Sequence, residues 1–264
     1  MKVAAIGDNC VDVYPDIGRY YATGNAVDFA VNMSKFGVRT SLISTRGNDK
    51  YGDEIFQALQ SWNVDVSHLR VTAGNTAISY MTLVGRERTY GDYIEGVMED
   101  IQFSDDDIAF AARHDLVHSA FWGHAEKHLP ELKKQGAKIS FDYATELGDP
   151  LVQETIPCVD FAFFSYEKRD RFIEEYLQDI VDRGAMLATA TFGVNGSLVY
   201  DGERFHEYGV FPAEVVNTVG AGDSYIAGFL FEILRGGTVA HAQRTGAKTA
   251  AKVVGVFEPW TEET

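Results

Sequence analysis

Short apolar runs alternate with amphipathic helical stretches along most of this chain, and this alternation constrains the fold more than any other feature. The run KVAAI at residues 2–6 precedes a helical pattern that ends near Gly37, and TSLISTRG at residues 40–47 precedes another that begins near residue 51. Strands that alternate with helices favour a parallel sheet with crossover helices. The pattern resumes near residue 104. We therefore expect an α/β fold with a doubly wound, mostly parallel sheet flanked by helices.

Two β-rich inserts interrupt the alternation. They are VDVYPDIGRYYATG at residues 11–24 and TAISYMTLVGRERTYGDYIEG at residues 76–96. The second insert is typical of two antiparallel strands joined by a turn around residues 85–87. We expect a small β-sheet lid, with strands from about residues 9–22 and 76–96, on a single domain that spans residues 1–264.

Charge and composition exclude several classes of protein. The net charge of −16 argues against non-specific binding to nucleic acid. No apolar run approaches the roughly 20 residues that a membrane-spanning helix needs, and the N-terminus does not resemble a secretory signal. Two cysteines, Cys10 and Cys158, are typical of reduced cytosolic thiols. We expect a cytoplasmic protein with neither a nucleic-acid nor a membrane partner.

The stretch VVNTVGAGDSYIAGFLF at residues 215–231 places its smallest residues at the start of an apolar helix. A helix start offers unpaired N–H groups and a positive dipole end, which suit a phosphate. Gly220 and Gly222 allow the backbone to approach an anion closely. Asp223, in the first turn, could accept a proton from an attacking alcohol. A glycine-rich turn with an aspartate favourably placed at a helix start explains these residues about equally well.

The longer pattern NTVGAGDSYIAGFL is similar to the C-terminal signature of the PfkB (ribokinase-like) carbohydrate kinases. The resemblance implies a ribokinase-like fold, with ATP and Mg²⁺ as cofactors, and it leaves open whether a monovalent cation assists. It implies an anion hole at Gly220, Ala221 and Gly222, and a general base at Asp223. Asn217 stands where the family usually has an aspartate. If this position helps to hold the magnesium ion and its waters, the affinity for the metal would be weaker in this chain.

Two N-terminal stretches extend the resemblance to the sugar site. In GDNCVD, residues 7–12, Asp12 falls where the family has an aspartate that binds sugar hydroxyls; an ordinary loop acid is the alternative. TGNAVDFA, residues 23–30, resembles the family's Gly-Gly-x-x-x-Asn opening of a helix that contacts substrate. Gly24 and Asn25 fit that pattern, whereas Thr23 replaces a glycine and Asp28 replaces the asparagine.

The nucleotide site is implied by TFGVNGSLVY at residues 191–200, which resembles a segment that lines the family's ATP site. The resemblance assigns ATP binding to Thr191, Gly193, Gly196 and Thr218, although a tight turn would explain Gly196 equally well. The family's Asn-x-x-Glu element is absent, because residues 165–168 are SYEK. Glu167 is the weak candidate that could replace its metal contact.

Several further stretches look closer to a branch of the family that acts on fructosamines: IGDNCVDVYP, YGDYIEGVMED and VHSAFWGHAE. This implies transfer of phosphate to the C6 hydroxyl of a fructose joined through nitrogen to lysine. The lid residues that could meet such a substrate are Arg88, Tyr90 and Asp92, although an exposed hairpin would carry such charges anyway. Trp122 and His124 follow a buried strand, where ligands of α/β sheets collect.

Two other functions stay open. The chain could be a fructokinase- or ribokinase-type kinase of a free sugar, or a nucleoside kinase, with the same chemistry. It could also be a sugar-binding protein with impaired catalysis, given the missing Asn-x-x-Glu element. An exposed edge of the lid sheet would favour a homodimer through the lid.

Overall fold

The computed structural model describes residues 1–84 and 87–260. Within these residues, nine strands form the main sheet in the order β13-β12-β11-β10-β9-β8-β1-β4-β5. Seven of these strands run parallel to one another: β5, β4, β1, β8, β9, β10 and β11. At one edge of the sheet, β12 pairs antiparallel with β11, and β13 pairs antiparallel with β12. Their bounds are β1 Lys2–Ile6, β4 Arg39–Gly47, β5 Asp65–Thr72, β8 Leu116–Ala120, β9 Lys138–Asp142, β10 Phe161–Ser165, β11 Leu187–Thr191, β12 Ser197–Tyr200 and β13 Phe205–Tyr208.

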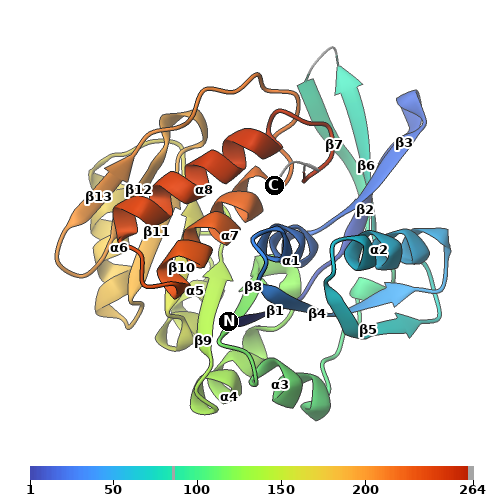
Figure 1. Cartoon of the computed structure of the whole chain (residues 1–264), viewed down its shortest axis with the longest axis horizontal. Helices are drawn as coiled ribbons and strands as arrows, with labels where there is room; N and C mark the ends of the chain where they lie inside the picture. Colours follow the sequence, from blue (N-terminus) through green and yellow to red (C-terminus); the bar gives the residue numbers. More distant parts are fainter. Residues whose placement is uncertain (85–86, 261–264) are drawn as a thin grey trace.

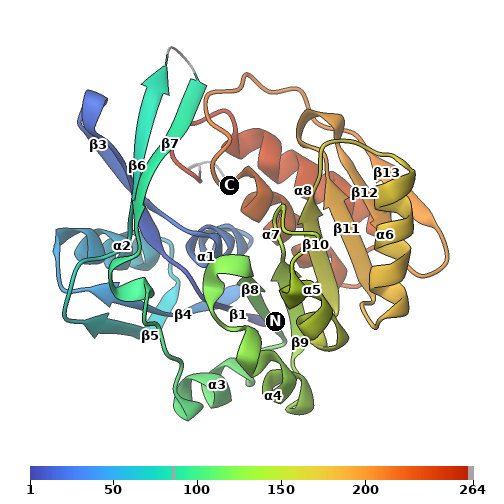
Figure 2. The same cartoon turned by 180° about the vertical axis from the view of Figure 1, so that it is seen from behind.

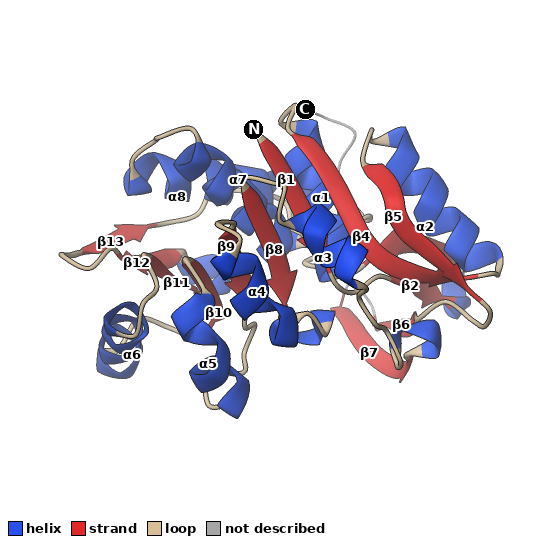
Figure 3. Cartoon of the chain, turned by 90° about the horizontal axis from the view of Figure 1, so that it is seen from below, coloured by secondary structure: helices blue, strands red, loops and turns tan. Residues whose placement is uncertain are grey.

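Helices cover both faces of this sheet and give the molecule three layers (Figure 3). One face carries α1 (Asn25–Lys35), α2 (Lys50–Ser61), α7 (Ala221–Leu234) and α8 (Val239–Val253). The other carries α3 (Asp105–Ala111), α4 (Leu129–Lys134), α5 (Pro150–Thr155) and α6 (Arg171–Asp182). Among the described residues, no helix combines the length and the apolar character needed to cross a bilayer.

Two apolar cores lie on the two faces of the sheet, as the pleat of its strands requires. Ala4 and Ile6 of β1 belong to one core, and Val3 and Ala5 belong to the other. Successive side chains of a strand point to opposite faces. A strand buried on both faces is therefore apolar throughout, which explains the uninterrupted apolar run at residues 3–6, after the exposed Lys2.

Both β-rich inserts contribute to a separate sheet of four strands in the order β3-β2-β6-β7. Its strands are β2 (Cys10–Tyr14), β3 (Arg19–Thr23), β6 (Ile78–Val84) and β7 (Glu87–Ile94). Figures 1 and 2 show this small sheet standing off the main body, with β6 and β7 projecting beyond it. The turn predicted at residues 85–87 falls partly on residues 85 and 86, which lie outside the described residues.

Three elements differ from the sequence-based expectation. The sequence pattern predicts a helix from about residue 124 to 135. In the structure His124 adopts a left-handed conformation (φ 55°), Glu126–His128 forms a separate 3₁₀ turn, and α4 begins only at Leu129. The sequence pattern also missed β5 and α5. β5 lies at the sheet edge and buries only Leu69 fully, so it lacks the continuous apolar run of the central strands.

Helices α7 and α8 cross with their backbones almost in contact. A Cβ added at Gly246 would lie 2.8 Å from the carbonyl oxygen of Tyr225, and one added at Gly228 would lie 3.0 Å from that of Thr245. Glycine removes the side chains that would separate the two helices. Since residues 223–230 of α7 are all buried, this crossing fixes where the first turn of α7 stands.

We expect Gly246→Ala to lower the free energy of unfolding by about 1–3 kcal/mol, because the new methyl group must displace backbone. Denaturant unfolding at equilibrium measures the change. Gly148→Ala is the matched control, since an added Cβ there meets nothing within 4 Å. Equal stability of Gly246→Ala and wild type would contradict the close crossing.

Candidate active site

Four segments that are distant in the sequence meet at the carboxyl edge of the main sheet, beside the small sheet. Asp8 follows β1, Asp142 is the last residue of β9, Asn25 begins α1 and Asp223 lies in the first turn of α7. The carboxyl ends of parallel strands are where ligands bind in open α/β sheets. These four polar residues therefore mark the candidate active site.

Asn25 connects the N-terminal and C-terminal parts of this site. Its backbone N–H donates to Asp8 Oδ2 at 2.9 Å, and its side-chain Nδ2 donates to Asp223 Oδ1 at 2.9 Å. Gly24, just before it, has φ 119°, and an added Cβ would lie 2.7 Å from Asn9 Cα. Only glycine lets the start of α1 pack this closely against the loop after β1. The predicted pair Gly24–Asn25 thus positions Asp223.

Asp223 is 8% exposed, and its surroundings disfavour its charged form. Burial, followed by the charge of Asp142, raises the pKa of Asp223 to about 8, against the opposing hydrogen bond from Asn25. Burial also raises the pKa of Asp142 to about 6. A carboxyl group with a pKa near the working pH suits general-base catalysis, because it is basic enough to take a proton and still ionises.

Asp8, Asp12 and Asp28 complete a group of buried acids that we call the carboxylate cluster: Asp8, Asp12, Asp28, Asp142 and Asp223. Asp28 Oδ2 accepts a hydrogen bond from Thr23 Oγ1 at 2.8 Å, and Asp12 Oδ2 accepts one from the Tyr21 hydroxyl at 3.2 Å. Burial, then the charge of Asp223, raises the pKa of Asp28 well above its usual value. The Oδ1 atoms of Asp8 and Asp28 are buried and have no hydrogen-bond partner among the described residues.

The start of α7 has the backbone geometry that the glycine loop suggested. Gly220 adopts a left-handed conformation (φ 72°), and an added Cβ there would lie 2.7 Å from the carbonyl oxygen of Pro259. The Ala221 N–H donates to the Thr218 carbonyl at 3.2 Å. The N–H of Gly222 lies in the first turn, where no acceptor within the helix is available. An anion could therefore bind at this backbone.

The other predicted substrate residues lie in the segment after β8 and on β7. Trp122 is 49% exposed in the turn Phe121–Gly123 after β8, and His124 follows it. Asp92 is exposed on β7. Arg88 and Tyr90 also belong to β7, and their side chains lie outside the part of the chain that the structure describes. His118 is fully buried within β8, where it belongs to the interior of the protein.

One residue of the site was not identified from the sequence. Asp142 ends a buried strand, and it lies close enough to raise the pKa of Asp223. Tyr93 lies on β7, and its side chain is 53% exposed. A carboxylate at the end of a buried strand is a usable signal for Asp142, since such ends share one edge of the sheet.

The predicted nucleotide residues lie at the ends of β11 and before α7. Thr191 ends β11, and Gly193 (φ 55°) and Gly196 (φ 88°) bound the following turn. A Cβ on Gly196 would collide with the carbonyl oxygen of Tyr208, so the return of the chain into β12 already requires glycine there. Thr218 is exposed in the loop that enters α7. The backbone therefore requires glycine at position 196 whether or not ATP binds there.

The described residues do not form a metal centre by themselves. No group of three or more His, Cys, Asp or Glu side chains in residues 1–84 and 87–260 is arranged to hold a metal ion. Glu167 is exposed in the turn after β10. Asn217 donates to the Phe257 carbonyl at 2.7 Å and accepts from the Val219 N–H at 3.0 Å. An aspartate could not make the first bond, which explains the asparagine at this position.

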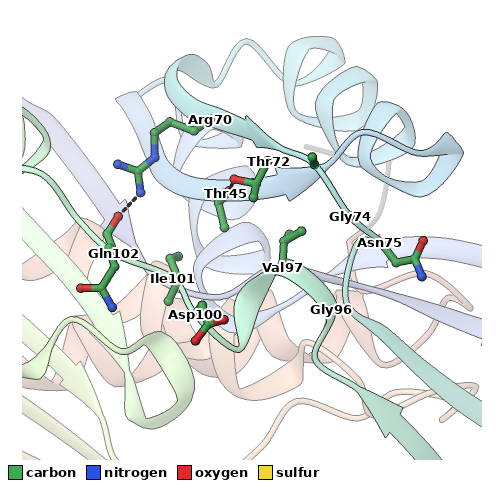
Figure 4. Close-up of a pocket in the computed structure, with 11 residues that line it drawn as sticks. Thr45, Arg70, Thr72, Gly74, Asn75, Gly96, Val97, Asp100, Ile101 and Gln102 are labelled. Atoms are coloured by element: carbon green, nitrogen blue, oxygen red, sulfur yellow. Dashed lines mark hydrogen bonds between the residues drawn. The ribbon is translucent and has the colours of Figure 1, made fainter.

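A cavity of about 420 Å³ lies at the ends of β4 and β5, beside the carboxylate cluster. Figure 4 shows Thr45, Thr72 and Val97 around it, with the Arg70 guanidinium donating to the Gln102 carbonyl at its rim. None of its lining residues belongs to the carboxylate cluster. Asn9, next to Asp8, donates to the Thr45 carbonyl at 2.6 Å. The cavity therefore neighbours the site without being part of it.

Residues 8–261 match the family described as pfkB family carbohydrate kinase. The chain belongs to this family. It is 40% identical to fructoselysine 6-kinase of Escherichia coli K12 over 258 residues, which cover 98% of this chain and 99% of that protein. It is 31% identical to fructosamine kinase FrlD of Bacillus subtilis, with 97% and 92% covered. The resemblance that the sequence motifs suggested is thus confirmed.

Solved structures confirm the predicted fold of this pfkB protein. Ribokinase of Arabidopsis thaliana complexed with ribose and ATP superposes with a TM-score of 0.85 at 20% identity, covering 97% of this chain and 92% of that one. A sugar kinase of Pyrococcus horikoshii in complex with ATP gives 0.77 at 21% identity, covering 98% and 94%. The ribokinase-like α/β fold, with a separate small sheet, is the fold of this chain.

We expect Asp223→Asn to stabilise this pfkB protein increasingly as the pH rises from about 4 to 8. Because the pKa of Asp223 is raised to about 8 in the folded state, its contribution to stability is full below the unfolded pKa and is lost as pH rises through the folded pKa. The asparagine never ionises, so the gap in Tm over wild type should reach roughly 5 °C at pH 8. Thermal unfolding at several pH values measures it.

The exposed Asp106 provides the matched control for this prediction. Asp106→Asn should change Tm little, and equally at every pH. A Tm gap between Asp223→Asn and wild type that stays constant from pH 4 to 8 would contradict the raised pKa of Asp223.

Proposed function

We propose that this protein transfers the terminal phosphate of ATP to the C6 hydroxyl of a fructosamine, a fructose joined through nitrogen to an amine such as the side chain of lysine. The observation that carries the proposal is the buried carboxyl of Asp223 beside the Gly222 N–H at the start of α7. Two relatives support the choice of substrate class: a fructoselysine 6-kinase that is 40% identical and a fructosamine kinase that is 31% identical, each over nearly the whole of this chain.

In the proposed reaction, Asp223 accepts the proton of the C6 hydroxyl as its oxygen attacks the terminal phosphorus, and ADP leaves with the electrons of the broken P–O bond. Asn25 holds Asp223 Oδ1, so Oδ2 is the atom that faces the hydroxyl. The N–H groups of Gly220 and Gly222, with Ala221 between them, stabilise the charge on the phosphoryl oxygens.

The remaining site residues are proposed in three groups. Sugar binding is assigned to Asp12, Gly24, Asn25, Asp28, Arg88, Tyr90, Asp92, Trp122 and His124, and ATP binding to Thr191, Gly193, Gly196 and Thr218. We propose that the small sheet acts as the lid of a single domain and excludes water. Magnesium would arrive with the ATP phosphates and keep several waters, with Glu167 as a weak protein contact; a monovalent cation is left open.

We also propose a homodimer formed through the small sheet. Strands β3 and β7 are its edges, and an open strand edge can pair with another chain. Exposed apolar side chains of these strands, Tyr20, Tyr93 and Ile94, supply surface for such a contact.

The proposed function predicts ATP-dependent turnover of fructoselysine with a higher kcat/KM than that of fructose, ribose or adenosine. A coupled assay of ADP release measures the rates, and NMR of the product locates the phosphate at C6. Asp223→Ala should lower kcat by roughly 10²–10⁴-fold, the usual share of a general base. Asp106→Ala is the control.

Each alternative has its own outcome in this assay. A preference for fructose, ribose or adenosine would identify a free-sugar or nucleoside kinase. Ligand-induced stabilisation without any ADP release would identify a binding protein. Wild-type turnover by Asp223→Ala would disprove the role of the base.

A further inference from the structure

We propose that the carboxylate cluster selects a positively charged nitrogen on the sugar, and that Asp8 and Asp28 provide the two oxygens that bind it. This inference rests on the proposed function and adds the residues that distinguish an aminated sugar from a free one. The nitrogen in question is the protonated secondary amine that joins the fructose to its substituent. It carries two N–H donors.

The first argument is the hydrogen bonding of the buried oxygens. Asp28 Oδ2 is held by Thr23 and Asp8 Oδ2 by the Asn25 N–H, so each carboxylate is fixed through one oxygen. The other oxygen of each, Oδ1, is buried without a partner among the described residues. Leaving a buried acceptor unpaired is costly. Two unpartnered oxygens match the two N–H donors of a secondary ammonium.

The second argument is charge. Asp28 senses the charges of Asp223, Asp12 and Asp8, and Asp223 senses Asp142 and Asp8. Among the described side chains, no lysine or arginine forms an ion pair with Asp8, Asp28, Asp142 or Asp223. A neutral hydroxyl would satisfy an oxygen but leave the mutual repulsion of the acids. A cation relieves both.

The proposed contact between the substrate's ammonium group and the carboxylate cluster would also affect Asp223, the general base. The acids that face Asp223 come from three elements: Asp8 after β1, Asp28 on α1 and Asp142 on β9. His124 is the basic side chain that acts on Asp8, and Cys10 and Tyr93 face the cluster from the small sheet. A bound cation offsets the repulsion from these acids and favours the ionised form of Asp223. An aminated sugar would therefore help to activate its own general base.

The test uses two probes that differ only in the group that links C1 to the propyl chain: a protonated amine with two N–H donors in 1-deoxy-1-(propylamino)fructose, and a neutral ether oxygen in 1-O-propylfructose. We expect wild type to phosphorylate the amine with a kcat/KM about 10–100-fold higher, the range for a hydrogen bond to a charged group. In Asp28→Asn this ratio should fall toward one. In Asp106→Asn, on the exposed surface of α3, the ratio should stay as in wild type.

Binding without ATP gives a second measurement. Calorimetry in buffers of different ionisation enthalpy should detect protons released when the amine binds near pH 7, and none when 1-O-propylfructose binds. Asp8→Asn is the second variant in case Asp28→Asn fails to fold, which circular dichroism would reveal; it should reduce the same ratio.

The outcomes separate this inference from the proposed function. Equal kcat/KM for the two probes in wild type would overturn the inference and leave the kinase intact. A loss in Asp28→Asn that is equal for both probes would also overturn it, because it would show that Asp28 only positions neighbouring groups. Failure of wild type to phosphorylate any sugar or fructosamine would instead overturn the proposed function.

Discussion

The hydrogen bond between Asn25 and Asp223 is the interaction on which the site depends. It joins residues 198 positions apart in the sequence, and each partner is held by a second constraint. Asn25 is fixed by Asp8 and by the close approach at Gly24, and α7 is fixed by its glycine crossing with α8. The orientation of one carboxyl group is therefore set by the packing of both ends of the chain. Geometry of this kind is what a catalytic base needs.

The price of this arrangement is electrostatic. Burial first, and then the charges of neighbouring acids, disfavour the ionised forms of Asp142 and Asp223, so the pKa values of both carboxyl groups are raised. Such clusters are typical of functional sites, where stability is given up for reactivity. The chain as a whole carries a net charge of −16, so the rest of the protein offers little positive charge to offset these buried acids.

Local patterns predicted much of the fold and part of the site, for reasons that individual residues make plain. The glycines and Asp223 form a local motif, so their place at a helix start could be inferred from sequence. The sequence marks Asp142 as a carboxylate at the end of a buried strand, but its closeness to Asp223 depends on where β9 lies in the sheet relative to α7, which no local pattern specifies. Asn217 was read as a possible metal position, and only its contact with Phe257 reveals a structural bond. The edge strand β5 was missed because its apolar residues do not form a run.

The contact between Gly220 and Pro259 has a consequence for local opening of the fold. The loop that opens α7 packs against a residue 39 positions later in the sequence, beyond α8. Detachment of that later segment would release the loop while both apolar cores stay packed, because parts of a protein can open without global unfolding. The backbone at the start of α7 would then lose its shape before the rest of the molecule unfolds.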